Sequence, residues 1–226
     1  MCDRYHLLSL WRDDAEMRRL GLPQAALPAG LGERIDCVRS TWAPIVRNDD
    51  RDALQVDNRR WGFHRHYPAT NRRLQPAKRE LFIADAAQVT RLPSFQAGFT
   101  LRRCLVPMSS WSERPHGERK KPLVEIFQPG RAVFAVAGLY ETSQDIRTDL
   151  PVDTFIILTR PDTSTGSARH AIPLLLDEQD YLPWLNDGHA AHRLARGEAK
   201  LGGDQEQATE GGVAEFFGQV DPGLRF

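Results

Sequence analysis

The chain has 226 residues, 41% hydrophobic and 27% charged, which is the composition of a globular protein with a buried core. Its 30 basic side chains balance its 30 acidic ones, so the net charge gives no overall attraction to a polyanion. No apolar run approaches the roughly 18 residues of a membrane-spanning helix, and the N-terminus lacks the pattern of a signal peptide. We therefore expect a cytoplasmic protein with no membrane contact.

The predicted elements are mostly strands. Alternating or apolar runs predict strands, and helical periodicity predicts helices near both ends. In chain order they are a helix at Asp13–Leu20, strands at Leu54–Trp61, Pro122–Phe127, Phe134–Leu139 and Thr154–Thr159, and a helix at Asp177–Leu185. Gln128-Pro129-Gly130 predicts a hairpin turn between two of these strands, Asp177 a helix cap, and Pro183 a limit to the last helix. Because strands outnumber helices without βαβ alternation, we expect one α+β domain on a mainly antiparallel, barrel-like sheet with peripheral helices.

A basic stretch overlaps the first predicted strand. Residues 58–79 contain seven lysines and arginines, two histidines and no acid, interleaved with Trp61, Phe63 and Tyr67. Cations for phosphates and rings for bases are what single-stranded DNA binding requires. A solvated basic face explains the same composition, and local composition alone slightly favours it.

The C-terminal part differs from the rest of the chain. From about Gly188 it is polar and rich in glycine, with one segment that fits an amphipathic helix, and it ends on the apolar VAEFFGQVDPGLRF. We expect a domain at residues 1–186 and an extension at 187–226 that docks on it.

The three cysteines, Cys2, Cys37 and Cys104, have no CxxC spacing. A disulfide framework or structural zinc site is therefore not expected, and we predict neither metal nor cofactor. Cys2 is distinctive because removal of Met1 leaves an α-amine and a thiol on adjacent carbons. This pair condenses with an aldehyde and closes to a thiazolidine, and an abasic site in DNA exposes such an aldehyde.

Six motifs occur in one order along the chain. They are MCDRY, RRWGF, RRCLVPMSSWSE, KKP, AGLYE, and TFIILT followed by HAIPLLLDEQDYLPWL. Their order and spacing resemble the SOS-response-associated peptidase (SRAP) family over roughly residues 1–186. The strongest part is Cys-Leu-Val-Pro with Glu113 six residues past the proline.

The resemblance implies three catalytic residues. Cys2 matches the nucleophile that links to the abasic aldehyde, and Glu113 matches the general acid/base that is also tied to autoproteolytic exposure of the cysteine. His170 stands one place after the family's histidine position, which Arg169 occupies here. In a strand, that displacement reverses the face that the side chain meets, so His170 reaches the site only through a bulge or a shift.

The resemblance also implies DNA contacts. Arg60 and Trp61 match the family's RWG element, and Trp111 matches an aromatic residue two places before the glutamate. Gln75 or Pro76 replaces an asparagine that positions the sugar, and Lys78 keeps a cation where the family has arginine. The chain also has Ser112 in place of the tyrosine before the glutamate, and Asp3 in place of the glycine of MCGRF.

The predicted function is DNA damage repair: binding of single-stranded DNA with abasic sites and formation of a DNA–protein cross-link, as a lyase-type activity with peptidase processing of Met1. Two alternatives remain open. A non-catalytic relative that still binds single-stranded DNA would bind it equally after Cys2→Ser. A cysteine hydrolase using Cys2, His170 and Glu113 would cleave peptides without DNA.

Overall fold

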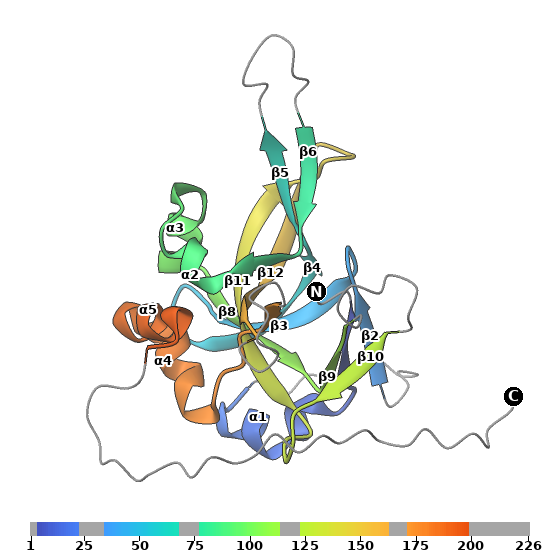
Figure 1. Cartoon of the computed structure of the whole chain (residues 1–226), viewed down its shortest axis with the longest axis vertical. Coiled ribbons are helices and arrows are strands. Elements are labelled where there is room, and N and C mark those ends of the chain that lie inside the picture. Colours follow the sequence, from blue (N-terminus) through green and yellow to red (C-terminus); the bar gives the residue numbers. More distant parts are fainter. Residues whose placement is uncertain (1–3, 23–33, 68–76, 114–122, 163–170, 199–226) are drawn as a thin grey trace, which may run out of the picture.

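The computed structural model describes residues 4–22, 34–67, 77–113, 123–162 and 171–198 (Figure 1). Cys2, Gln75, His170 and the chain from 199 onward lie outside these residues. Within the described ranges, no helix has the length and apolar character needed to cross a membrane.

A closed five-stranded barrel forms the centre of the molecule. Its strands are β3 (Trp42–Asn48), β4 (Leu54–Trp61), β8 (Arg103–Met108), β11 (Phe134–Gln144) and β12 (Pro151–Pro161). They follow the order β11-β8-β3-β4-β12, and pairing of β11 with β12 closes the ring. Among the five barrel strands only the β12–β4 pairing is parallel, and closure leaves these strands without a free edge. The expected α+β fold on a mainly antiparallel, barrel-like sheet is confirmed.

Side-chain alternation along the barrel strands separates two cores. Cys104 and Val106 on β8 belong to one buried cluster, and Leu105 between them belongs to the other. The cluster containing Leu105 also takes in helix residues such as Phe99 and Trp184, so that face of the sheet packs against helices. The other cluster fills the opposite face with rings that include Tyr5, Trp61, Trp111 and Phe155.

Gly138 lets three barrel strands approach closely. A Cβ at this position would lie 2.9 Å from the Cys104 Sγ, from a Val106 methyl and from the Ile156 carbonyl oxygen. These atoms belong to β8 and β12, the two neighbours of β11. The glycine of the AGLYE motif is therefore required by packing within the barrel.

A second sheet lies beside the barrel, in the order β10-β9-β1-β2 (right side of Figure 1). Its strands are β1 (Arg4–Leu8), β2 (Arg34–Val38), β9 (Ser110–Glu113) and β10 (Val124–Phe127). The turn predicted at Gln128–Gly130 is present, with Gly130 at a φ of 72°, but the predicted hairpin is wrong. β10 pairs with β9, whereas β11 pairs with β8 and β12.

Two strands form an arm that projects from the barrel (Figure 1). β5 (Phe63–Tyr67) continues directly from β4 and pairs with β6 (Ala77–Leu81). Gly62, between β4 and β5, has a φ of 129°, and a Cβ there would lie 2.8 Å from the Phe82 ring. The glycine of the RWG element thus makes the bend that starts the arm.

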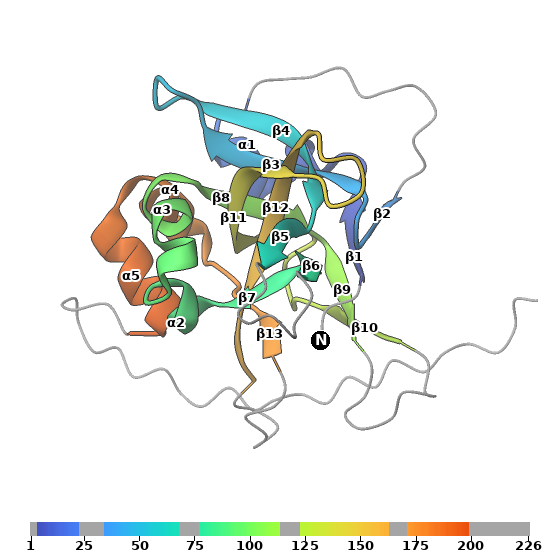
Figure 2. The same ribbon diagram turned by 90° about the horizontal axis from the view of Figure 1, so that it is seen from above.

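The helices gather on one side of the barrel (Figure 2). They are α2 (Ala86–Val89), α3 (Pro93–Leu101), α4 (Tyr181–Asn186) and α5 (Gly188–Arg196), while α1 (Ala15–Arg19) lies apart. Two 3-10 helices, η1 (Trp11–Asp13) and η2 (Glu178–Asp180), precede α1 and α4, and the short strands β7 (Ile83–Asp85) and β13 (Ala171–Pro173) extend the sheet from β12. The last predicted helix is corrected: the α-helix begins at Tyr181, Pro183 lies in its first turn, where a missing N–H costs little, and Asp177 makes no side-chain cap.

Candidate functional site

Glu113 ends β9 with its side chain inside the protein. The residue is 3% exposed, and the Trp111 Nε1 donates a hydrogen bond to its Oε1 over 2.9 Å. Residues two apart in a strand share a face, which explains why these two side chains meet. Trp111 is 4% exposed and its ring packs edge-on against Phe134, with 6.1 Å between the ring centroids, so the donor is held in place. A buried carboxyl group with a fixed hydrogen bond has the geometry needed for directed proton transfer.

The strand that carries Glu113 runs beside the first described residues. β1 pairs antiparallel with β9, with Arg4 opposite Ser112 and Tyr5 opposite Trp111. Glu113 is therefore one residue beyond the position that pairs with Arg4. The sheet brings together two segments that are more than 100 residues apart in the sequence.

Trp61 is a core residue in this structure. Its ring is 0% exposed, its Nε1 donates to the Phe82 carbonyl at 2.8 Å, and Tyr5 packs edge-on against it at 5.3 Å. Phe155 stacks on it with a ring separation of 6.4 Å. The ring offers no exposed face to a DNA base, and Trp61 instead stabilises the packing of the segments that contain Tyr5, Phe82 and Phe155.

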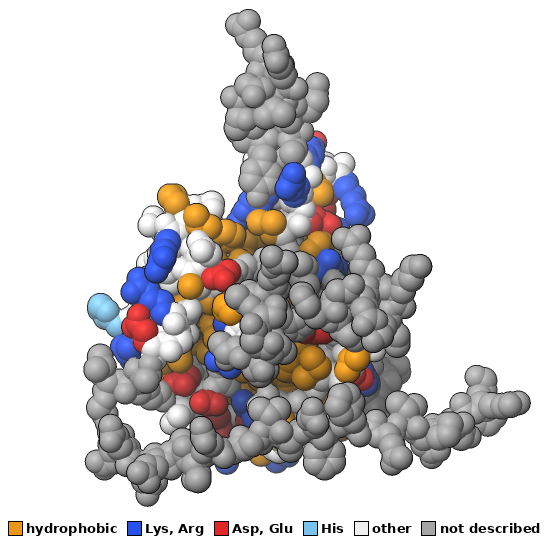
Figure 3. Space-filling view, in the orientation of Figure 1, with side chains coloured by type: hydrophobic (Ala, Val, Ile, Leu, Met, Phe, Trp, Pro, Cys, Tyr) orange, Lys and Arg blue, Asp and Glu red, His pale blue; other side chains and the backbone are white. Residues whose placement is uncertain are grey.

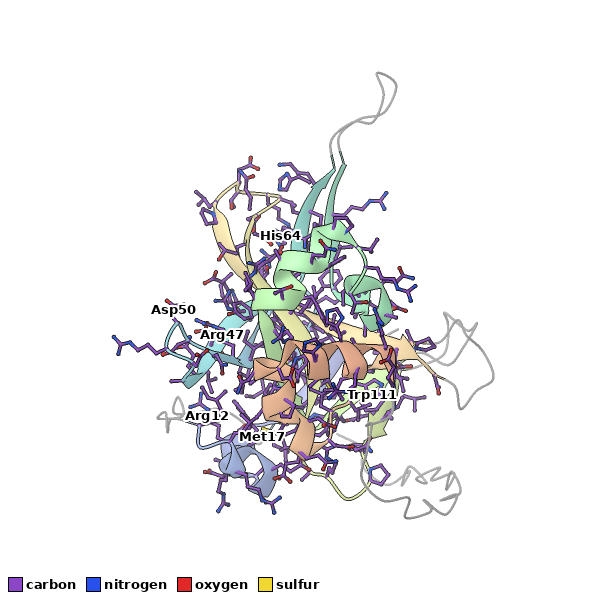
Figure 4. The ribbon with its side chains drawn as sticks, turned by 90° about the vertical axis from the view of Figure 1, so that its left-hand side faces the viewer. Arg12, Met17, Arg47, Asp50, His64 and Trp111 are labelled. Carbon is purple, nitrogen blue, oxygen red and sulfur yellow. The ribbon has the colours of Figure 1, made fainter. Side chains whose placement is uncertain are left out.

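Arg60 joins an ion-pair network at the foot of the arm. Its guanidinium donates to Asp145 at 2.7 Å and to Glu80 at 3.1 Å, and the side chain is 13% exposed. The fully buried His64 ring lies in the same network, with Nε2 3.2 Å from Glu80 and Nδ1 accepting the Ile146 backbone N–H at 3.0 Å (Figure 4). Burial lowers the pKa of His64, although Asp145 and Glu80 act to raise it, and a neutral ring fits its role as acceptor.

The described basic side chains of this stretch are largely paired with acids from other parts of the chain. Lys78 bonds to Asp149 at 3.0 Å, and Arg65 pairs with Glu141. Arg59 contacts Asp57 and Asp153, at 3.1 and 3.2 Å. Lysine and arginine side chains nevertheless reach the surface where the arm meets the body (Figure 3). The positive charge expected from residues 58–79 is thus reduced in the part that the structure describes.

The chain belongs to a known family: a family model described as "SOS response associated peptidase (SRAP)" matches residues 1–207. This confirms the resemblance to the SRAP family. The fold agrees, because a protein from Bacteroides thetaiotaomicron superposes with a TM-score of 0.63 at 20% identity, covering 86% of each chain. A phage-related protein from Bordetella bronchiseptica gives 0.60 at 17% identity, covering 88% of this chain and 90% of its own.

Curated relatives of this SRAP protein match over a shorter range. The abasic site processing proteins YobE and YoaM of Bacillus subtilis are 27% identical over 108 residues and 30% identical over 110 residues. Each match covers 47% of this chain, and 49% and 48% of the relative. The chain thus spans about half the length of the curated relatives that it matches.

The described part of this SRAP chain has no group of three or more potential metal ligands among its histidines, cysteines and acids. Cys104 is fully buried, which raises its pKa and keeps it protonated, and burial raises the pKa of Cys37 to about 11. Neither thiol is a candidate nucleophile in this fold. Glu113, in contrast, can be identified from the sequence alone, by its spacing from Pro107 in the RRCLVPMSSWSE motif.

Proposed function

We propose that this protein processes abasic sites in single-stranded DNA by capturing the exposed aldehyde on Cys2. The proposal rests on membership of the SRAP family, on the names of the curated relatives and on the pairing of β1 with β9. Cys2 precedes Arg4 by two residues, so chain connectivity keeps their Cα atoms within about 7 Å. Arg4 pairs with Ser112, the residue next to Glu113, and this pairing supports the proposal that Cys2 acts together with the Glu113 carboxyl group. We expect this activity in the cytoplasm.

The proposed reaction has a processing step and a capture step. Hydrolysis of the Met1–Cys2 peptide bond consumes one water and frees the Cys2 α-amine. The amine then adds to the abasic aldehyde and loses one water, giving a Schiff base. Addition of the Cys2 thiol to the C=N bond closes a five-membered thiazolidine, whose ring nitrogen takes up the thiol proton.

Glu113 is the proposed acid and base for these steps. Amine addition and water loss require a proton to leave nitrogen and another to reach oxygen, and a carboxyl group held by Trp111 can move both. His170 is proposed to assist, on the resemblance alone.

The DNA contacts in the proposal differ in their structural support. Lys78 is exposed on the arm and reaches a phosphate by exchanging its bond to Asp149. Arg60 and the buried Trp61 and Trp111 act by shaping the protein surface around the DNA strand. Gln75 is proposed to contact the sugar, on the resemblance alone.

A denaturing gel tests the capture step. The protein is incubated with a single-stranded oligonucleotide containing one abasic site, and we expect a covalent band. Cys2→Ser keeps an α-amine but cannot form the thiazolidine, so its band should be lost in denaturant. An oligonucleotide with a tetrahydrofuran site, which has no aldehyde, controls for non-covalent retention. Equal binding of both proteins without any covalent band would instead favour a DNA-binding relative without this chemistry.

A further inference from the structure

The outer face of the second sheet carries a polar cluster that the proposed capture reaction does not use. His6 on β1 lies between β2 and β9 in that sheet and is 5% exposed. It is directly opposite Asp36 on β2 and diagonal to Ser112 on β9, which pairs with Arg4. Three neighbouring strands therefore aim a histidine, a carboxylate and a hydroxyl at one another.

The distances place both His6 ring nitrogens within hydrogen-bonding reach of a partner. His6 Nδ1 lies 2.6 Å from Asp36 Oδ1, and His6 Nε2 lies 3.3 Å from Ser112 Oγ. The hydrogen bond from His6 lowers the pKa of Asp36, which favours its carboxylate form as the acceptor. An Nδ1–H that donates to Asp36 leaves the Nε2 lone pair to accept the Ser112 hydroxyl proton.

This cluster opens into a pocket of about 590 Å³. Besides the three residues above, Arg4, Arg34, Leu123 and Glu125 line it. Glu125 accepts bonds from Ser110 and from Arg34, the latter at 2.7 Å, and its Oε1 lies 3.9 Å from His6 Nε2, farther than the Ser112 hydroxyl. Arg4 brings a guanidinium to the pocket, and a cation there favours negative charge on a bound oxygen.

We propose that Ser112, His6 and Asp36 form a second nucleophilic site, which hydrolyses esters of small carboxylic acids and is independent of Cys2. The arrangement is that of a nucleophile, a general base and an orienting carboxylate, which is recognised by geometry and not by position in the sequence. The pocket's open side, its one apolar wall at Leu123 and its cation at Arg4 fit a small acyl group with a polar carbonyl.

The reaction balances without a cofactor. Ser112 Oγ bonds to the ester carbonyl carbon while its proton passes to His6 Nε2, and the alcohol leaves with that proton. Water then attacks the acyl-serine, giving a proton to His6, and the carboxylic acid departs as the proton returns to Ser112 Oγ. Asp36 accepts the Nδ1–H bond throughout and keeps the ring oriented.

The test uses the full chain with Cys2→Ser, which removes the reactive thiol from the assay. A fluorophosphonate probe is expected to phosphonylate Ser112 with loss of fluoride, as located by peptide mass mapping. His6→Gln should abolish this label, and Ser112→Ala should lower hydrolysis of p-nitrophenyl acetate at least about 100-fold. Ser110→Ala is the matched control, because Ser110 is buried on the same strand and face but bonds to Glu125.

Two results would overturn the proposal. One is a probe that leaves Ser112 unlabelled in the parent protein, a readout that needs no variant to fold. The other is ester hydrolysis that falls equally in Ser110→Ala and Ser112→Ala, at unchanged melting temperature, which would assign the cluster a structural role only. The abasic-site assay on Cys2-containing protein is separate, so either proposal can fail alone.

Discussion

Glu113 is the described residue on which the proposed capture chemistry depends most. Glu113→Gln keeps the side chain's shape and an oxygen that can accept from Trp111 Nε1, but it removes the proton-transfer group. We predict that the rate of covalent capture falls about 100-fold, within the range for loss of a general acid or base, while DNA affinity stays unchanged. Denaturing gels of samples quenched at successive times measure the rate of capture, and fluorescence anisotropy measures the affinity for DNA. A rate within twofold of the parent would remove Glu113 from the mechanism.

Arg103 is a buried residue that stabilises the contact between helices and barrel. It is 9% exposed, and its guanidinium donates to the carbonyls of Phe99, Thr100, Trp184 and Leu185. These carbonyls lie near the ends of α3 and α4, where helical carbonyls lack partners.

Arg103→Met is predicted to lower the free energy of unfolding by about 3 kcal/mol, because several buried carbonyls lose their donors. Urea denaturation measures the difference. Arg91→Met, an exposed arginine in the turn after α2, should change the free energy of unfolding by less than about 0.5 kcal/mol. If both variants unfold alike, the Arg103 hydrogen bonds contribute little to stability.

At the scale of elements, the arm depends on a network that links β4, β5 and β6 to the loop after β11. Arg60 bridges Glu80 and Asp145, and His64 accepts the Ile146 N–H beneath them. Lys78 adds a bond to Asp149 in the same loop. The orientation of the arm is therefore coupled to whether the His64 ring stays neutral.

The lowered pKa of His64 gives this network a pH dependence. A histidine in the unfolded chain has a pKa of about 6.5, so below that pH the unfolded chain binds a proton that the folded ring does not. Stability contributed by neutral His64 is thus complete above about pH 6.5 and declines as the pH falls toward the lower folded pKa.

Urea denaturation at pH 7.5 and at about pH 5.5 measures this loss of stability. The free energy of unfolding of His64→Gln should fall less between the two pH values than that of the parent protein. Gln offers an oxygen to the Ile146 N–H but does not titrate. The variant also controls for His192, whose pKa is likewise lowered by burial, because that residue is unchanged in both proteins. Identical pH dependence in the two proteins would contradict the role given to His64.

The sequence predicts the elements better than it predicts their partners. The bounds predicted for Leu54–Trp61 are those of β4, because its apolar and polar positions partly alternate along a strand of intermediate burial. The hairpin at Gln128–Gly130 is wrong because a turn reverses the chain without deciding which strand the next one joins. β10 pairs with β9, and β11 completes the barrel.

The same limit applies to the candidate site. Spacing within one segment finds Glu113, but local composition cannot reveal that Arg65 and Lys78 pair with Glu141 and Asp149 some 70 residues later. Nor does it reveal the cluster of His6, Asp36 and Ser112, which come from three strands. The structure shows that His6 is a buried histidine whose ring nitrogens contact Asp36 and Ser112.

At the scale of the whole molecule, the barrel and its helices form one packed unit that extends to α5. Ala191 and Ala195 of α5 belong to the same buried cluster as Trp184 and Phe99. Asp187 caps α5 with bonds to two backbone N–H groups, at 2.8 and 3.2 Å. The predicted boundary after residue 186 therefore falls just before a helix that shares the core.

Two truncations test that boundary. Removal of residues 187–226 exposes the surface that α5 covers and should lower the melting temperature by more than about 5 °C. Removal of residues 199–226 keeps α5 and should lower the melting temperature by a smaller amount. Differential scanning fluorimetry compares the two, and an equal loss would place the stabilising contacts beyond α5.

The proposed function requires that Cys2, once freed of Met1, captures an abasic aldehyde in single-stranded DNA. Intact-mass spectrometry of the purified protein, before and after incubation with an oligonucleotide bearing one abasic site, tests it most directly. We predict a protein without Met1, then an adduct whose mass is the sum of the two components less one water, absent from Cys2→Ser. A protein that has lost Met1 and forms no such adduct would contradict the claim.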